Sequence, residues 1–348
     1  MKPWLPLMLL ALAAVVCPQA LADDKPVADK PITGEDMAQA AGASLIGKYA
    51  PPITVTTVDG KTIDLTRFYG KKPVYLKFWA TWCVPCRLQM PHFENVEKTM
   101  GNDIQVVAIN AGFNETRDAV LRYRQTMGLT MPIVIDDGRL ADALHLRVTP
   151  QHIVIGRDGR ILHIGNNADA PLDHALAQAL AEPAAAYSRA DSAGSTASGH
   201  GTAPVLKTLT GETLSLREGA RPTVVFFFSP WCESYLKTSR PAMADACLKA
   251  RDEVSQVKRA PGVRWMGVAA GLWATQKDLA AYQHEHALPM PVALDETGAF
   301  FRAFKVAEVP SFVVLDGSGH VVARTQQAEV ANRAAARLLA RALSAKEL

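Results

Sequence analysis

A short apolar run, Val74–Trp79, leads directly into a Cys-x-x-Cys pair formed by Cys83 and Cys86. The run is apolar and β-branched, which predicts a buried strand, and a helix is expected to begin at the pair. The N-terminus of a helix carries partial positive charge and unpaired N–H groups, which favour a thiolate over a thiol. Only the thiolate attacks a disulfide, and a second sulfur one turn along can resolve the mixed disulfide. The pattern therefore predicts thiol–disulfide exchange at the end of a buried strand.

The cysteine pair has two other interpretations, a zinc site and a structural disulfide. Zinc takes four ligands, usually from a second Cys or His pair, and His92 is the one nearby candidate in the sequence. A disulfide that closes so short a loop would constrain little of the unfolded chain. The flanking Trp82 and Pro85 favour the redox interpretation, which requires neither a metal nor an organic cofactor.

Residues 1–22 have the pattern of an export signal. Lys2 supplies the positive charge, Leu5–Val16 a short apolar core, and Ala20–Ala22 a small-x-small cleavage site. The core is shorter than the ~20 apolar residues of a membrane span, and no later segment approaches that length. A lipid anchor at Cys17 is disfavoured because the bulky Val16 before it fits a lipoprotein site poorly. We therefore expect a soluble protein exported to the periplasm.

The length of 348 residues predicts about two domains. The expected division is an N-terminal extension at 23–48, a first domain at 49–182, a flexible Ala/Ser/Gly/Thr-rich linker at 183–202 and a second domain at 203–348. The formal net charge is +3, and removal of Lys2 with the signal lowers it by one. A nucleic-acid partner therefore has no electrostatic support.

Periodicity and turn residues predict the same order of strands and helices in both halves of the chain. In the first half we expect strands at Val74–Trp79, Ile104–Asn110, Ile133–Ile135, Gln151–Ile155 and Arg160–Ile164, with helices from the cysteine pair (kinked at Pro91), over Glu115–Met127 and over Asp173–Ala181. In the second half we expect strands at Thr223–Phe228, Val263–Ala269, Pro291–Leu294, Phe312–Leu315 and His320–Ala323, with helices from Cys232, over Gln276–Ala287 and over Ala328–Leu343. The chain is thus predicted to be an internal repeat of whole domains.

Cys232 takes the place of the first cysteine in this repeat, but Tyr235 stands where the second belongs. In a continuous helix Cys247 would lie ~22 Å from Cys232, whereas a disulfide allows roughly 4.4–6.8 Å between Cα atoms. We expect Pro241 to bend the helix too little to close that gap. The sequence therefore predicts a secondary thiol at Cys232 and a small buried apolar residue at Cys247.

The stretch from Phe78 to Cys86, with Pro91 five residues on and Thr149-Pro150 before the terminal hairpin, resembles the thioredoxin superfamily. The closest resemblance is to its exported TlpA/ResA-like branch of periplasmic thiol:disulfide reductases. It covers nearly all of the first half and, more loosely, the second. It implies an α/β fold class, with two thioredoxin-like folds in tandem, each a central mixed β-sheet flanked by helices, the second being degenerate.

The resemblance also implies roles for individual residues. Cys83 would be the nucleophile and Cys86 the resolving thiol. Pro150 would be held cis against the pair, with Trp82 beside the substrate and Thr149 offering it backbone hydrogen bonds. The partners implied are client proteins with disulfides or cysteines and a membrane thiol electron donor.

Two departures from the family concern charge near the sulfurs. The buried acid that thioredoxins carry six residues before the first cysteine is Lys77, and the acid that some TlpA/ResA-like proteins carry three residues after the second is Gln89. A nearby cation favours the thiolate and so makes a pair more oxidising; alternatively, Lys77 points out of the sheet and reaches water. His152 is expected to be a core histidine.

The sequence leaves three functional alternatives open: a reductase, an oxidase or isomerase, and a non-enzymatic binding or chaperone module.

Overall fold

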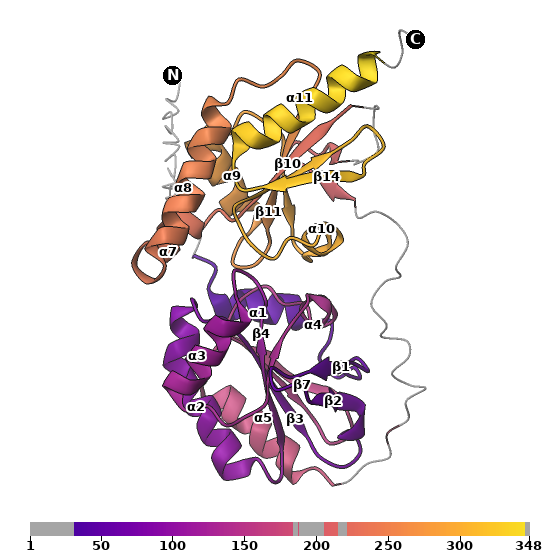
Figure 1. The fold of residues 1–348 in the computed structure, drawn as a ribbon. Helices are drawn as coiled ribbons and strands as arrows, with labels where there is room; N and C mark the ends of the chain where they lie inside the picture. Colours follow the sequence, from indigo (N-terminus) through magenta and orange to yellow (C-terminus); the bar gives the residue numbers. More distant parts are fainter. Residues whose placement is uncertain (1–30, 184–186, 188–204, 215–220, 345–348) are drawn as a thin grey trace, which may run out of the picture. The chain divides into compact units, whose positions relative to one another are not determined.

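The computed structural model describes residues 31–183, 187, 205–214 and 221–344 (Figure 1). The predicted export signal, Cys17 and nearly all of the predicted linker lie outside these residues, so the expected domain boundaries stay predictions. The described chain from Thr33 onward belongs to one compact unit. Within the described ranges, no helix combines the length and apolar character that crossing a membrane requires.

The first half is built on a five-stranded mixed sheet with the order β5-β4-β3-β6-β7. The central strand β3 is buried along its whole length, parallel to β4 and antiparallel to β6. The strands are β3 (Val74–Trp79), β4 (Gln105–Asn110), β5 (Ile133–Ile135), β6 (Gln151–Ile155) and β7 (Ile161–Gly165). All five predicted strands are confirmed, with ends that differ by at most one residue.

Alternation along β3 gives the sheet two buried faces. Tyr75 and Trp79 belong to a cluster with α2 (Val84–Met100), α3 (Arg117–Met127) and α5 (Ala170–Ala181). Val74, Leu76 and Phe78 of β3 pack on the opposite face, in a cluster that includes residues of α4 (Arg139–Ala143). Helix α2 continues through Pro91 to Met100. The helix of the cysteine pair therefore covers the face to which Tyr75 and Trp79 point.

The second half repeats this sheet with the order β12-β11-β10-β13-β14. Its central strand β10 is again parallel to one neighbour and antiparallel to the other. The elements are β10 (Thr223–Phe228), β11 (Arg264–Ala270), β12 (Val292–Asp295), β13 (Ser311–Leu315), β14 (Val321–Thr325), α7 (Cys232–Ser239), α8 (Pro241–Gln256), α9 (Gln276–Glu285), α10 (Ala299–Ala303) and α11 (Ala328–Ser344). The predicted repeat of two α/β folds in tandem is confirmed.

The sequence patterns did not predict several short elements. These are α1 (Gly34–Gly42), β1 (Thr54–Thr56), β2 (Thr62–Asp64), a 3-10 turn at Leu65–Arg67, β8 (Leu206–Lys207), β9 (Thr213–Leu214), α4 and α10. Thr33 is the N-cap of helix α1 and forms a capping box with Asp36, a local signal that the sequence contains.

The expectation of a continuous helix from Cys232 to Cys247 is wrong. The chain leaves the helix at Arg240, with φ −144° and ψ 63°, and restarts as α8 at Pro241. A residue before proline is disfavoured in the α region, so Pro241 ends α7 rather than bending it. Helices α7 and α8 meet at this break (Figure 1), and Cys247 bonds to Cys232 with a Cα–Cα distance of 6.2 Å.

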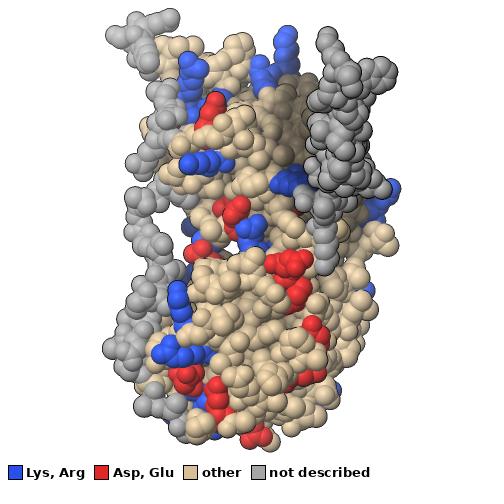
Figure 2. Space-filling view, turned by 180° about the vertical axis from the view of Figure 1, so that it is seen from behind, with Lys and Arg blue, Asp and Glu red and all other residues tan. Residues whose placement is uncertain are grey.

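Acidic and basic side chains are interspersed on the face of the molecule shown in Figure 2. Within the described residues, several acidic and basic side chains form ion pairs, as Arg124 does with Asp59 at 2.8 Å. This distribution agrees with the small formal net charge.

Candidate active site

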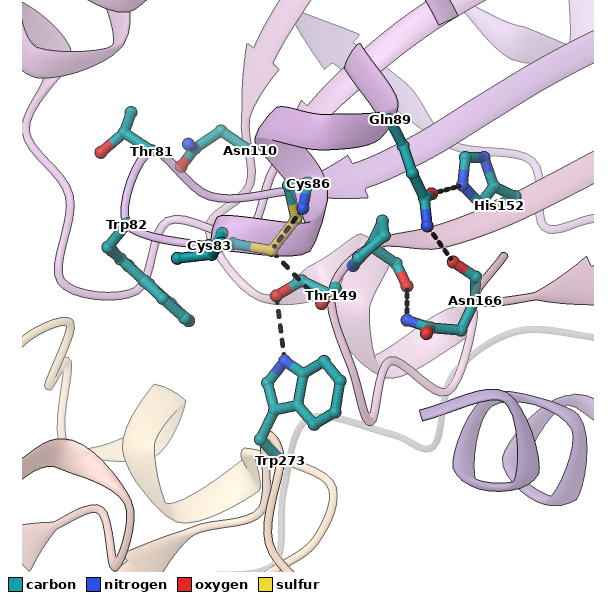
Figure 3. The surroundings of a disulfide bond; sticks show 12 residues. Thr81, Trp82, Cys83, Cys86, Gln89, Asn110, Thr149, His152, Asn166 and Trp273 are labelled. Atoms are coloured by element: carbon teal, nitrogen blue, oxygen red, sulfur yellow. Dashed lines mark hydrogen bonds between the residues drawn. A yellow bond between two sulfur atoms is a disulfide. The ribbon is translucent and has the colours of Figure 1, made fainter. Parts of the chain in front are cut away.

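The site begins with the disulfide between Cys83 and Cys86, at the point where β3 gives way to α2 (Figure 3). The sulfurs are 2.03 Å apart and the two residues are 1% and 0% exposed. Cys83 is the N-cap of α2, and its Sγ accepts a hydrogen bond from the Cys86 N–H at 3.2 Å. An N–H that points at sulfur stabilises negative charge there, so this position favours a thiolate once the disulfide is reduced.

The loop before β6 lies directly against the first sulfur. The Thr149-Pro150 peptide bond is cis, as the resemblance implies, and the Thr149 carbonyl oxygen lies 3.3 Å from Cys83 Sγ. Asn166 Nδ2 donates to the Pro150 carbonyl at 2.5 Å, and Trp273 Nε1 donates to Thr149 Oγ1 at 3.2 Å (Figure 3). The loop is therefore held by hydrogen bonds beside Cys83 Sγ.

Trp82, just before the first cysteine, is buried by aromatic contacts. Its Nε1 donates to the Phe113 carbonyl at 2.8 Å, and its ring stacks on Trp231 with centroids 5.1 Å apart. The Val84 N–H donates to the Tyr235 hydroxyl at 3.0 Å. Tyr235, which stands where the motif at Cys232 lacks a second cysteine, therefore caps helix α2 of the Cys83–Cys86 motif.

Lys77 is fully buried on β3, so the interpretation that it reaches water is wrong. Its Nζ has no hydrogen-bond partner among the described residues and lies 5.5 Å from the centroid of the Phe93 ring, on α2. Loss of water lowers the pKa of this amine to about 7. Lys77 therefore places an amine that titrates near neutrality under the helix of the cysteine pair.

Gln89 is part of a chain of hydrogen bonds that runs from the partly exposed helix α2 to the buried Tyr75. His152 contacts the Tyr75 hydroxyl through Nδ1 and Gln89 Oε1 through Nε2, both at 2.7 Å, and Gln89 Nε2 donates to the Asn166 carbonyl at 3.2 Å. Burial lowers the pKa of His152, and the charge of Lys77 lowers it further. The expectation of a satisfied core histidine is confirmed. Through Asn166 these hydrogen bonds connect Gln89 to the Pro150 carbonyl, a connection that the sequence did not reveal.

Sequence reasoning missed Glu115, a carboxylate buried beside this site. Its oxygens accept hydrogen bonds from the Thr81 N–H, the Thr81 hydroxyl at 2.8 Å and Asn110 Nδ2 at 3.2 Å. Burial raises the pKa of Glu115, although these donors oppose the shift. Its position shortly after β4 was a usable signal, because the carboxyl ends of adjacent parallel strands lie at the same sheet edge.

The second half contains a second disulfide at the corresponding position. Cys232 is the first residue of α7, directly after β10 and the Ser229–Trp231 loop, and it bonds to Cys247 on α8. The predicted secondary thiol is therefore a disulfide in this structure, because the break at Arg240 brings the two cysteines together. The Val309-Pro310 bond, before β13, is also cis.

His92, the nearby candidate for a zinc ligand, instead contacts Asp173 Oδ1 through Nε2 at 3.0 Å. Among the described residues, no group of three or more His, Cys, Asp or Glu side chains is arranged to hold a metal ion.

A cysteine pair at the junction of a central strand and a helix, beside a cis-proline loop, defines a thiol–disulfide exchange site of the thioredoxin type. Comparison with known proteins agrees. The Redoxin family matches residues 45–180. The thiol-disulfide oxidoreductase ResA of Bacillus anthracis is 34% identical over 34% of this chain and 67% of its own length. The thioredoxin-like protein YneN of Bacillus subtilis is 32% identical over 37% of this chain and 78% of its own.

A thiol:disulfide interchange protein of the thioredoxin family from Chlorobium tepidum has a solved structure that is 29% identical to this chain. The match covers 38% of this chain and 97% of that one, with a TM-score of 0.35. The similarity to these sequence relatives shows that the chain belongs to the thioredoxin superfamily, among its ResA-like thiol:disulfide oxidoreductases.

Proposed function

We propose that the protein reduces disulfides of exported client proteins, with Cys83 as nucleophile and Cys86 as resolving thiol. The observation that carries the proposal is the position of Cys83 Sγ, at the N-cap of α2 and 3.3 Å from the Thr149 carbonyl. In the reduced protein the Cys83 thiolate attacks a client disulfide and forms a mixed disulfide. Cys86 then attacks Cys83, which releases the reduced client and leaves the disulfide seen here.

Trp82, Thr149 and Pro150 are proposed to bind the client next to the sulfur. An extended client segment would pair with the backbone of the loop before β6 and hold its sulfur in line with Cys83. In the structure, Trp231 and Trp273 of the second half contact Trp82 and Thr149. We therefore propose that the second half regulates client access to this site.

Export and the source of electrons complete the proposal. The pattern of residues 1–22 supports cleavage after Ala22 and function in the periplasm. Each turnover consumes two electrons, which a membrane thiol donor would return to the Cys83–Cys86 disulfide. In cells, a mature N-terminus at Asp23, measured by mass spectrometry, is the expected sign of cleavage.

A trapping experiment tests the assignment of the two cysteines. Cys86→Ser should accumulate clients as mixed disulfides, because attack needs only Cys83 whereas release needs the second sulfur. Peptide mapping should place every trapped client on Cys83. Trapping that persists when Cys83→Ser is added would show that another cysteine is the nucleophile.

Lys77 favours a second candidate function, oxidation or isomerisation of client disulfides. The Lys77 amine lies under α2, at the position where thioredoxins carry an acid. In its protonated form it stabilises thiolate and therefore the reduced pair, which makes the disulfide a better oxidant. The distinguishing measurement is the reaction of the oxidised protein with a reduced dithiol peptide. Rapid oxidation of that peptide together with poor reduction of insulin would favour this candidate over the reductase.

A further inference from the structure

We propose that Cys232–Cys247 is a second thiol–disulfide exchange centre, more reducing than Cys83–Cys86, whose dithiol form passes two electrons to the first disulfide. The proposal goes beyond reduction of clients, because it gives the chain an internal electron donor. It also replaces the interpretation that the second half has no redox chemistry because Tyr235 stands at the position of the second cysteine.

The position of the second disulfide in the fold matches that of the first. Each pair begins where the central strand of a five-stranded sheet gives way to a helix, and the residue before each first cysteine is a tryptophan. Both pairs are nearly inaccessible: Cys232 and Cys247 are 0% and 6% exposed, against 1% and 0% for Cys83 and Cys86. Burial therefore gives no reason to regard only the second pair as structural.

A hollow in the surface lies beside residues that neighbour the second pair. It is lined by the turn between α7 and α8, by Met243 and Ala246 of α8, and by Val309 and Pro310. The Met243 carbonyl oxygen lies 3.9 Å from Cys232 Sγ, and Ala246 directly precedes Cys247. A thiol that enters this hollow thus comes to the residues that surround the disulfide.

Hydrogen bonding to sulfur distinguishes the two pairs. Cys83 is an N-cap and its Sγ accepts the Cys86 N–H, whereas Cys232 is already inside α7, whose N-cap is Trp231. Cys232 Sγ instead contacts the Met243 carbonyl. Among the described residues, no N–H donates a hydrogen bond to Cys232 Sγ. Hydrogen bonds to thiolate stabilise a reduced pair and make it more oxidising. The second pair lacks this stabilisation, so it should be the more reducing of the two.

The exchange balances with a dithiol reductant as the external source. One thiolate of that reductant attacks Cys247 Sγ, the S–S bond breaks and Cys232 leaves as thiolate; the second thiol of the reductant then releases Cys247 and closes the reductant's own disulfide. Next, the Cys232 thiolate attacks Cys83 Sγ and Cys86 leaves. Finally, Cys247 attacks Cys232 and Cys83 leaves, which restores Cys232–Cys247 and yields reduced Cys83 and Cys86.

The stacked rings of Trp82 and Trp231 bring the two cysteine-bearing turns together, since each tryptophan directly precedes a reacting cysteine. Exchange between the pairs therefore has a structural route within one chain.

The first experiment compares the two pairs in the full chain. Cys83→Ser with Cys86→Ser leaves only the second pair, and Cys232→Ser with Cys247→Ser leaves only the first. Each variant is equilibrated with mixtures of reduced and oxidised dithiothreitol, and thiols are counted by alkylation and mass spectrometry. We expect the second pair to require about a tenfold higher ratio of reduced to oxidised reagent for half reduction.

The second experiment needs no variant and so does not depend on how the variants fold. Fully reduced wild-type protein receives one equivalent of oxidant and is brought to equilibrium with trace dithiothreitol before alkylation. About tenfold more chains should carry Cys232–Cys247 than Cys83–Cys86, because electrons settle on the less reducing pair.

An excess of Cys83–Cys86 instead would reverse the direction and overturn the proposal. Reduction of Cys232–Cys247 only after unfolding would make it a structural disulfide and also overturn it. Client trapping by Cys86→Ser would survive either result, so the two proposals fail separately.

Discussion

The two cysteine pairs of this protein occupy corresponding places in repeated folds but reach their second sulfur differently. In the first, Cys86 follows one turn along an unbroken α2. In the second, Tyr235 takes that place, and Cys247 is contributed by a separate helix across the break at Arg240. In the pair within one helical turn, the first sulfur lies at the helix N-terminus and accepts an N–H there. The pair between two helices instead links those helices covalently. The geometry thus combines an exchange site with a bond that also holds two elements in place.

The position of one proline separates the two arrangements. Pro91 lies eight residues after Cys83 and inside α2, whereas Pro241 lies nine residues after Cys232 and opens a new helix. Proline is well accommodated in the first turn of a helix and costly in its interior. The same residue type, shifted by one position, therefore lies inside a continuous helix in one half and begins a second helix after a break in the other.

The largest expected effect is a difference in the rate of insulin reduction between variants of the two cysteine pairs. With dithiothreitol as electron source, Cys83→Ser should reduce the rate of insulin reduction to that of the uncatalysed reaction, because no nucleophile remains beside Thr149. The matched variant, Cys232→Ser with Cys247→Ser, should keep the rate within about twofold, since the reagent reduces the first pair directly. Equal losses in both variants would mean that the pairs form one catalytic unit.

The second prediction concerns the buried amine. Lys77→Met should raise the free energy of unfolding at pH 7 by about 3–5 kcal/mol, because the folded pKa of about 7 lies below the ordinary 10.5. The unfolded chain binds the proton more tightly, so wild-type stability rises between pH 7 and pH 10.5 and the advantage of the variant shrinks over that window.

Urea unfolding at pH 7 and at pH 9.5 measures this change. Lys71→Met, at an exposed position six residues earlier, is the control and should show no such dependence on pH. A constant difference between Lys77→Met and wild type at both values would show that the amine remains hydrated.

The sequence predicted the strands well, because each central strand is a short apolar run bounded by turn residues. The cysteine motif and the Thr149-Pro150 bond were likewise predicted from local residues and the family resemblance. Cys247 was misassigned because a distance along one helix was applied across Pro241. The effect of a proline depends on which helical position it occupies, and the surrounding packing decides that position.

Side-chain environments were the least predictable part of the site. Alternation along β3 places Lys77 on the same face as Tyr75, yet charged residues on strands usually face water, and only the packing of α2 shows that it is buried. Gln89 and His152 meet across 63 residues of sequence. Contacts of that kind depend on how α2 lies across the sheet, which no local pattern specifies.

The third prediction restores a negative charge near the first pair. Gln89→Glu should make Cys83–Cys86 more reducing, with about a threefold to tenfold shift in its equilibrium with dithiothreitol, because a carboxylate one turn from Cys86 disfavours thiolate. The second pair should not shift in the same protein. Leu88→Glu adds the same charge at the neighbouring, 77% exposed position and is the matched control. Equal shifts in both variants would attribute the effect to net charge and remove Gln89 from the tuning of this site.

The smallest expected effect concerns Tyr235, the residue that takes the place of a cysteine in the second motif. Its hydroxyl accepts the Val84 N–H, one of the donors that the first turn of α2 leaves without a partner inside the helix. Tyr235→Phe keeps the ring that packs edge-on against Trp82 and Trp231 and removes only this acceptor. Because Val84 is exposed, water can replace the lost bond, and the free energy of unfolding should fall by about 0.5–1 kcal/mol, measured by urea unfolding. Unchanged stability would mean that the hydroxyl contributes nothing to the first helix. The replacement of a cysteine by Tyr235 would then have removed a sulfur without adding a stabilising hydrogen bond.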